Sequence, residues 1–414
     1  MKHLAQLLTC FIQNSIMIKS FLLPLIIIFS VVSTNAQKLN NESAADNFIK
    51  DQINQKKIAG AVIMISHKGE TIMHKAYGQQ DIDDKLKMET SSIFRIYSMT
   101  KPITSLATMM LVDWDSIALD DPIEMYISEL KNLMVLEKNE LVKSENKITV
   151  RDLLRHTSGF AYGIGLGSSK VDKLYDKNHP LFVSNNDQMV QRLSELPLQS
   201  NPGEKYNYSI SVDVLGCLIE RVSGMKLSEF FNKNIFEPLE MNDTHFKLPA
   251  SKVNRFCSYY ENNLKLKESY KTTHYTKDRR QSGGGGLVST SSDYLKFCKL
   301  LLNNGIYNND TLINPSIITE MTSNQLPKGE GVYKVNGDVG IGFGLGFMIY
   351  LKEWGKHGHK GDFGWNGIGS AHFYISPKDN LIVIIMSQKA PYSNTLVNGL
   401  KPIIFEGLKP YNKN

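Results

Sequence analysis

A serine placed three residues before a lysine can act as a nucleophile that has an amine beside it. Four such pairs occur in the 414-residue chain, beginning at Ser98, Ser128, Ser144 and Ser223. Residues three apart share one face of a helix, and the run KPITSLATMMLVDW after Ser98 favours a helix. The positive field of the first helical turn and the backbone N–H of Ser98 would stabilise the oxyanion that develops on a substrate when Ser98 attacks it. A serine that only caps a helix has the same placement, so the spacing alone leaves both interpretations open.

The hydrophobic pattern indicates which elements would position this pair. The N-terminal part predicts an amphipathic helix over 41–55 and two strands over 60–66 and 71–78 that form a hairpin. The region from about 111 to 280 has a mainly helical pattern, and strands return over 342–351, 370–376 and 380–388. Strands at both ends with helices between them predict an α+β fold. In this fold an antiparallel sheet is closed by the N- and C-terminal strands and flanked by helices, beside a mainly helical lobe.

The first 36 residues have the pattern of a signal peptide. Lys19 precedes an apolar run over 21–32, and small residues lead to a cleavage site after Ala36. Met17 is a possible true start. The apolar run is short for a membrane-spanning helix, although an uncleaved anchor is the alternative interpretation. We therefore expect an exported protein, periplasmic or secreted, without stable membrane insertion.

Composition excludes some classes of function. Hydrophobic residues make up 42% of the chain and charged residues 21%, which is ordinary for a globular protein. The net charge is +6, and its basic residues form no block interleaved with aromatics, so we expect no nucleic-acid partner. Cys217, Cys257 and Cys298 fit no zinc-site spacing and favour buried thiols, with one disulfide as the alternative.

The chain resembles the serine β-lactamase and penicillin-binding-protein superfamily, in the class C-like branch that includes the family VIII carboxylesterases. The resemblance extends from about residue 50 to 390. It rests on six segments in the right order: FRIYSMTKPITSLATMML (94–111), LDDPIEMYI (119–127), ITVRDLLRHTSGF (148–160), NPGEKYNYSISVDVLGCLIERVSG (201–224), GGGGLVSTSSDYLKF (283–297) and DFGWNGIGSAHFYISPKDNLIVIIMSQ (362–388). It implies one β-lactamase/transpeptidase-like catalytic domain over 37–410. Residues 37–110 and 281–410 would form its α/β part and 111–280 its helical lobe.

The resemblance also implies roles for individual residues. Ser98 would be the nucleophile, Lys101 its proton partner, and Tyr208 the group that passes the proton to the leaving group. The backbone N–H groups of Ser98 and Ile368 would form the oxyanion hole. Free lysine and tyrosine side chains titrate near ~10, so neither is a good base at neutral pH without help from its surroundings. Which of the two accepts the serine proton stays open.

Two departures from the family pattern bear on the substrate. The tyrosine motif often ends in Asn, but this chain has Ile210 there, which lacks the amide that binds the substrate amide in β-lactamases. The third motif is often Lys-Thr-Gly or His-x-Gly, and here we align Trp365, Asn366 and Gly367 with it as substrate-binding residues. A competing alignment uses residues 359–361 (His-Lys-Gly), which would restore a cation.

These departures favour carboxylic esters as substrates. A D-alanyl peptide or β-lactam is the alternative, and a catalytically silent ligand-binding relative is an alternative of another class. We expect a small ester or peptide-like substrate and neither a metal nor a cofactor. His357 and His359 lack a nearby third ligand, and the glycines at 283–286 lack phosphate-loop spacing. The sequence does not predict the oligomeric state.

Overall fold

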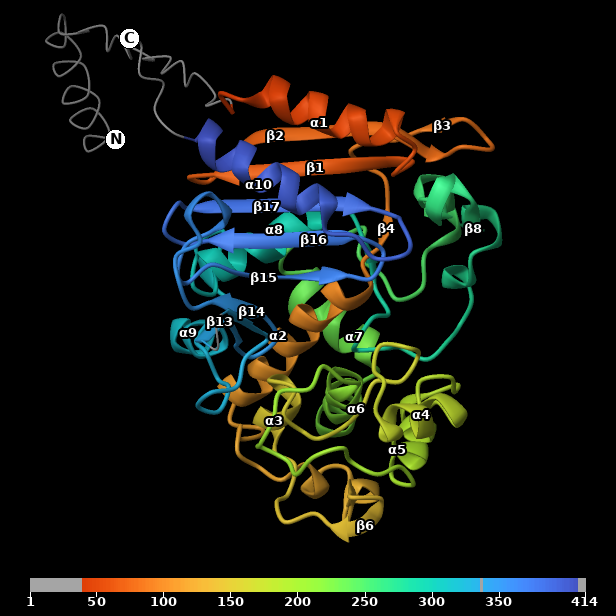
Figure 1. Cartoon of the computed structure of the whole chain (residues 1–414), viewed down its shortest axis with the longest axis vertical. Helices are drawn as coiled ribbons and strands as arrows, with labels where there is room; N and C mark the ends of the chain where they lie inside the picture. Colours follow the sequence, from red (N-terminus) through yellow and green to blue (C-terminus); the bar gives the residue numbers. More distant parts are fainter. Residues whose placement is uncertain (1–38, 336–337, 409–414) are drawn as a thin grey trace, which may run out of the picture. The chain divides into compact units, whose positions relative to one another are not determined.

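A nine-stranded antiparallel sheet organises the computed structural model, which describes residues 39–335 and 338–408 (Figure 1). Its strand order is β12-β13-β14-β15-β16-β17-β1-β2-β3. The strands are β1 Gly60–His67, β2 Glu70–Asp81, β3 Leu86–Lys87, β12 Tyr333–Val335, β13 Asp338–Phe343, β14 Met348–Tyr350, β15 Phe363–Gly367, β16 Ala371–Ser376 and β17 Leu381–Ser387.

The two ends of the chain meet in the middle of this sheet. Strand β1 pairs antiparallel with β17, from Ala61 opposite Ser387 to His67 opposite Leu381. The hairpin predicted between the first two strands is present, with β1 and β2 joined at residues 68–69. The α+β class and the closure of the sheet by terminal strands are therefore confirmed.

Both faces of the sheet are covered, which explains why its central strands are apolar throughout. Ala61 and Ile63 pack on one face with helices α1 (Glu42–Asn54) and α10 (Thr395–Gly407). The alternate residues of β1 join a larger core on the other face, which includes α8 (Ser291–Leu302) and the first long helix, α2 (Thr100–Asp113). Figure 1 shows α1 and α10 lying across the strands on the near side. Side chains alternate between two cores, as the period of a strand requires.

Helix α2 leads from the sheet into the helical region. It packs against α6 (Ser211–Ser223), which ends at the left-handed Gly224. The remaining helices are α3 Val150–Leu154, α4 Lys170–Lys177, α5 Asn186–Leu193, α7 Leu227–Phe231 and α9 Pro315–Met321. Short strand pairs, most of them outside the prediction, complete the fold: β4 Phe94–Arg95 with β9 Val288–Ser289, β5 Met134–Glu137 with β6 Glu140–Lys143, β7 Tyr259–Tyr260 with β8 Leu266–Glu268, and β10 Ile306–Tyr307 with β11 Asp310–Thr311.

The predicted signal peptide, with Met17 as a possible start and cleavage after Ala36, lies outside the described residues. In the ranges that the structure describes, no helix is both long and apolar enough to cross a membrane. The division into an α/β part and a helical lobe at residues 110 and 281 stays a prediction. Cys217, Cys257 and Cys298 are buried thiols without a disulfide.

Candidate active site

Ser98 is positioned by a strand pair that brings two distant segments together. Strand β4 pairs with β9, so that Phe94 lies opposite Ser289 and Arg95 opposite Val288. A hydrogen bond from Ile96 N to Leu287 O (3.2 Å) extends this pairing. Ser98 itself lies in a 3-10 turn, η1 (Tyr97–Met99), that runs into α2, and Tyr97 before it is left-handed with φ 43°. The predicted helix therefore begins two residues after Ser98, at Thr100.

The structure brings Ser98, Lys101 and Tyr208 together. Lys101 Nζ lies 3.2 Å from Ser98 Oγ, and Tyr208 OH lies 2.7 Å from the same oxygen. Ser98 and Tyr208 are half-buried, whereas Lys101 is 1% exposed. Two proton-carrying groups therefore meet the hydroxyl of Ser98 within hydrogen-bond distance.

Lys101 is held as a buried cation. Its Nζ donates to Gly284 O (2.7 Å) and to Tyr162 OH (3.4 Å) as well as to Ser98. Burial alone would lower the pKa of Lys101, but attraction to Tyr162, Tyr208 and Asp213 outweighs it and raises the pKa. The pKa of Tyr162 is raised to about 12 because its phenol is buried. At neutral pH Lys101 therefore carries its proton.

The glycine-rich segment supplies the carbonyl groups that hold α2. Thr104 Oγ1 donates to Gly283 O (2.7 Å), one turn after Lys101 bonds Gly284 O. A Cβ on Gly284 would lie 2.1 Å from Asp213 Oδ2, and one on Gly283 would lie 2.7 Å from Val212 O. The segment approaches α6 so closely that these two positions require glycine. This close packing, more than a tight turn, explains the glycines.

Tyr208 is positioned by the segment around RHTSGF. Asn207 N donates to His156 O (2.8 Å), and Asn207 Nδ2 donates to Phe160 O (2.7 Å). The His156 ring lies under Tyr208 with centroids 4.8 Å apart, and its Nδ1 accepts from Ser209 N at 3.3 Å. Burial lowers the pKa of His156 far below its usual value, so it supports Tyr208 as a neutral ring.

The residues aligned with the third motif lie at the end of β15. Trp365 is buried with its ring 5.4 Å from that of Tyr208, while Asn366 is half-buried and Ile368 is exposed. All three line the same cavity as Ser98. Gly367 does not line it, because its Cα packs on η1, where a Cβ would lie 2.5 Å from Ile96 O. Lys360 of the competing alignment is exposed and is not part of the lining.

The cavity above Ser98 has a volume of about 760 Å³ and mainly apolar walls. Aromatic side chains form much of it: Tyr97, Tyr162, Tyr206, Tyr208, Tyr275 and Trp365. Its rim contains five exposed apolar residues, with Phe182 as much as 71% exposed: Ile164, Leu166, Phe182, Ile368 and Tyr392. An apolar cavity with a few polar groups at its base is typical of a small-molecule site.

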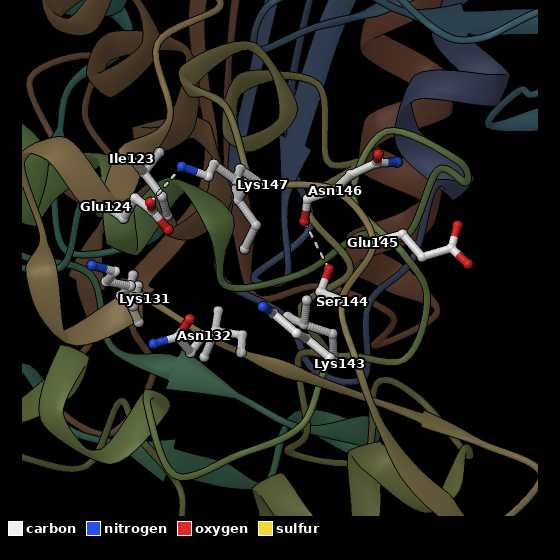
Figure 2. Close-up of a pocket in the computed structure, with 13 residues that line it drawn as sticks. Ile123, Glu124, Lys131, Asn132, Lys143, Ser144, Glu145, Asn146 and Lys147 are labelled. Atoms are coloured by element: carbon white, nitrogen blue, oxygen red, sulfur yellow. Dashed lines mark hydrogen bonds and ion pairs between the residues drawn. The ribbon is translucent and has the colours of Figure 1, made fainter.

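The other three Ser-x-x-Lys pairs do not form a comparable arrangement. Ser144 and Lys147 line a separate pocket of about 320 Å³ (Figure 2). There Ser144 Oγ donates to Asn146 O (2.7 Å), and Lys147 pairs with Glu124 (2.8 Å) instead of with the serine. Ser223 Oγ donates to Ile219 O within its own helix, and Ser128 is exposed.

Sequence reasoning missed Tyr162, whose OH accepts a hydrogen bond from Lys101 Nζ (3.4 Å). Its ring stacks on that of Tyr208, with centroids 5.3 Å apart and planes inclined by 22°. Tyr162 lies two residues after the end of the segment ITVRDLLRHTSGF, which was the available signal. Its place beside Lys101 depends on the fold, because 61 residues separate the two.

Comparisons with known proteins show the family and the fold of the chain. The family model described as Beta-lactamase matches residues 45–399. An uncharacterised protein of Mycobacterium tuberculosis is 30% identical over 350 residues, which cover 81% of this chain and 86% of the relative. Esterase EstB of Burkholderia gladioli is 24% identical over 83% of this chain and 90% of its own length. Simvastatin Synthase (LovD) from Aspergillus terreus has the same fold, with a TM-score of 0.77 and 21% identity over 90% of this chain and 99% of its own.

Proposed function

This chain belongs to the beta-lactamase family, and we propose that it is a serine hydrolase that cleaves carboxylic esters through an acyl-enzyme on Ser98. The observation that carries the proposal is the contact of Ser98 Oγ with both Lys101 Nζ (3.2 Å) and Tyr208 OH (2.7 Å). This contact lies at the base of an apolar cavity. A nucleophile with a proton partner within hydrogen-bond reach is the arrangement that acyl transfer needs.

In the first half-reaction Ser98 Oγ attacks the ester carbonyl carbon, and its proton moves to Tyr208. We assign this relay role to Tyr208, because its OH lies 2.7 Å from Ser98 Oγ and Lys101 is already protonated. Tyr208 then gives the proton to the departing alcohol as the carbon–oxygen bond breaks. In the second half-reaction water attacks the acyl carbon by the same route, and the released products are Ser98 and a carboxylic acid.

The oxyanion would be stabilised by the backbone N–H groups of Ser98 and Ile368. The close packing of Gly367 on Ile96 supports this role, since it holds the end of β15 against the turn that carries Ser98. Removing one donor from an oxyanion hole typically costs ~10²–10³ in rate.

Carboxylic esters fit the site better than β-lactams or D-alanyl peptides. Ile210 is buried and outside the lining, so no side-chain amide is offered at the end of the tyrosine motif. Trp365 provides apolar surface at the third motif in place of a cation. The esterase relative supports the same substrate class. Amide hydrolysis and a silent ligand-binding role are the alternatives, and export to the periplasm or medium stays part of the proposal.

Paired rates of hydrolysis test the proposal. The purified protein and its Ser98→Ala variant are compared on p-nitrophenyl butyrate and on nitrocefin. We expect ester cleavage that disappears in Ser98→Ala and little nitrocefin cleavage. Nitrocefin cleavage with little ester cleavage would contradict the substrate assignment, and ester cleavage that Ser98→Ala leaves unchanged would contradict the mechanism.

A further inference from the structure

The charged groups around the cavity are all basic. Among the described residues, its lining contains Arg279, Arg280 and His274 and no carboxylate. Arg280 is neutralised from behind the wall by Asp213, at 3.0 Å, and His274 lies 3.3 Å from Glu268. No carboxylate of the described chain lies within ion-pair distance of Arg279. The wall of the cavity therefore contains one cation without an ion-pair partner among the described residues, although Glu268 attracts it from a greater distance.

Arg279 is nevertheless held in a fixed position. Its guanidinium lies 4.1 Å above the centroid of the Tyr275 ring. Nη2 donates to Phe246 O (3.1 Å) and to Gly286 O (2.7 Å), and Nε is buried without a partner. Nη1 has no hydrogen-bond partner among the described residues. Half-burial has removed part of the water around this guanidinium, and no anion has replaced that water. The loss of hydration costs free energy unless a ligand supplies an anion.

The glycine-rich segment that binds Arg279 also contacts η1, the turn that carries Ser98. Gly286 follows Gly285, whose Cβ position lies 3.7 Å from the backbone of Tyr97, the residue before Ser98. Arg279 and Ser98 therefore line one cavity and share one rigid support. A ligand bound through Nη1 would therefore share the cavity with Ser98.

We propose that Arg279 binds a carboxylate of the substrate, so that the preferred substrates are esters whose acyl or alcohol part carries a free carboxylate. This inference rests on the proposed function and narrows its substrate class. The apolar wall would hold the hydrocarbon between the carboxylate and the scissile ester. Burial lowers the pKa of Arg279, and a bound carboxylate would offset that unfavourable burial.

A binding measurement tests the inference without turnover. Isothermal titration compares octanoate with octanamide, which match in length and differ in charge, on the wild type and on Arg279→Met. We expect octanoate to bind the wild type at least about 10-fold more tightly than octanamide, as a charge-assisted hydrogen bond allows. The preference should vanish in Arg279→Met and persist in Lys277→Met, which removes a nearby exposed cation outside the lining.

A kinetic measurement asks whether the carboxylate also matters during hydrolysis. The butyrate ester of 4-hydroxybenzoate carries a free carboxylate, and the butyrate ester of methyl 4-hydroxybenzoate is its neutral match. Arg279→Met should lower kcat/KM for the charged ester at least about 10-fold more than kcat/KM for the neutral ester. Arg279→Lys, which keeps the charge, should retain part of the preference and shows whether the loss reflects charge or folding.

Equal binding of octanoate and octanamide by the wild type would overturn the inference. So would an equal loss on both esters in Arg279→Met, because that pattern indicates a structural role for its bonds to Phe246 and Gly286. The proposed function fails separately, if neither ester is cleaved in a Ser98-dependent way. The titration still decides the inference in that case.

Discussion

At the scale of single residues, the chemistry depends on where the proton of Ser98 can go. Lys101 is buried and donates to Gly284 O, Tyr162 OH and Ser98 Oγ, which suits an ammonium group. Tyr208 OH lies 2.7 Å from Ser98 Oγ. In the mechanism that we propose, Lys101 acts through its charge, and Tyr208 transfers the proton.

Replacing Tyr208 with Phe should therefore remove the proton path and leave the fold intact. We expect kcat/KM for p-nitrophenyl butyrate to fall about 10²–10⁴-fold, the usual contribution of a general acid–base group. Tyr270→Phe is the matched control, because it removes a phenol hydroxyl outside the lining and should keep the wild-type rate. A Tyr208→Phe enzyme within twofold of the wild type would refute the assignment.

The ion pair between Glu268 and Arg95 should make stability depend on pH. Burial alone would raise the pKa of Glu268, but the hydrogen bond from His274 and the charge of Arg95 lower it to about 2 from 4.5. A lowered carboxyl pKa adds stability that is complete above pH ~4.5 and is lost as the pH falls toward ~2. The shift corresponds to about 3 kcal/mol at pH 7.

Urea unfolding of Glu268→Gln at several pH values checks this prediction. The difference from the wild type should be about 3 kcal/mol at pH 7 and should shrink steadily below pH ~4.5. Glu261→Gln, which breaks the exposed pair with Lys267, should change stability by less than about 1 kcal/mol. A difference for Glu268→Gln that is independent of pH would count against the ion pair.

Ser98, Lys101 and Tyr208 could be selected from the sequence because each lies inside a segment that is specific in itself. Tyr162, His156 and Arg279 could not, because their relevance depends on contacts between segments far apart in the chain. Tyr162 meets Lys101 across 61 residues, and Arg279 lines the cavity without an ion-pair partner among the described residues. That property is visible only after the fold has placed every carboxylate.

At the scale of elements, the glycine-rich segment 283–286 lies just before β9 in the chain and packs against the first turn of α2. Its carbonyl groups accept hydrogen bonds from Lys101 and Thr104. The pairing of β4 with β9 fixes this segment against Lys101, and α6 contacts it from the other side. Gly284 O can therefore accept the hydrogen bond from Lys101 Nζ only if the backbone at Gly284 passes close to the Asp213 side chain.

A single methyl group placed at neighbouring positions tests this packing. In Gly284→Ala the new Cβ would lie 2.1 Å from Asp213 Oδ2, whereas in Gly285→Ala its nearest contact would be 3.7 Å. We expect Gly284→Ala to lose about 1–3 kcal/mol of stability through overpacking and about 10-fold or more in kcat/KM. Gly285→Ala should resemble the wild type. Thermal melts and ester rates measure both, and equal effects of the two changes would contradict the account.

Long elements with a clear period could be predicted, including α1, β1 and β2, and their positions agree within a few residues. The helix α10 was missed because Gly399 and Pro402 interrupt its pattern, and packing against β1 and β17 compensates for them. The strand pairs β5–β6 and β7–β8 were missed because they are too short to show alternation. The turn at Ser98 was assigned to a helix because a 3-10 turn and a first helical turn share the same local sequence.

At the scale of the whole molecule, the sheet separates a core that contributes only stability from the core that supports the active site. One face carries α1 and α10 and forms a core that is distinct from the one around the active site. The other face supports α2 and, beyond it, the residues that meet Ser98. Stability contributed by the first core should therefore be separable from catalysis.

Leu400→Ala in α10 tests that separation. Leu400 is fully buried, so the change should cost about 2–5 kcal/mol of stability. We expect kcat/KM at 20 °C to stay within about twofold of the wild type, because no atom near Ser98 moves. Asn398→Ala, on the exposed side of the same helix, should change neither quantity. A large rate loss in Leu400→Ala at a temperature where it remains folded would show that the two cores are coupled.

The central claim is that Ser98 is an activated nucleophile, and covalent labelling tests it most directly. The protein is treated with a fluorophosphonate, and the modified residue is identified by peptide mass spectrometry. We predict stoichiometric labelling on Ser98 that is slowed strongly in Lys101→Met and absent in Ser98→Ala. Absence of labelling on Ser98 in the folded wild type, or labelling that Lys101→Met leaves unchanged, would contradict the claim and favour a silent ligand-binding protein.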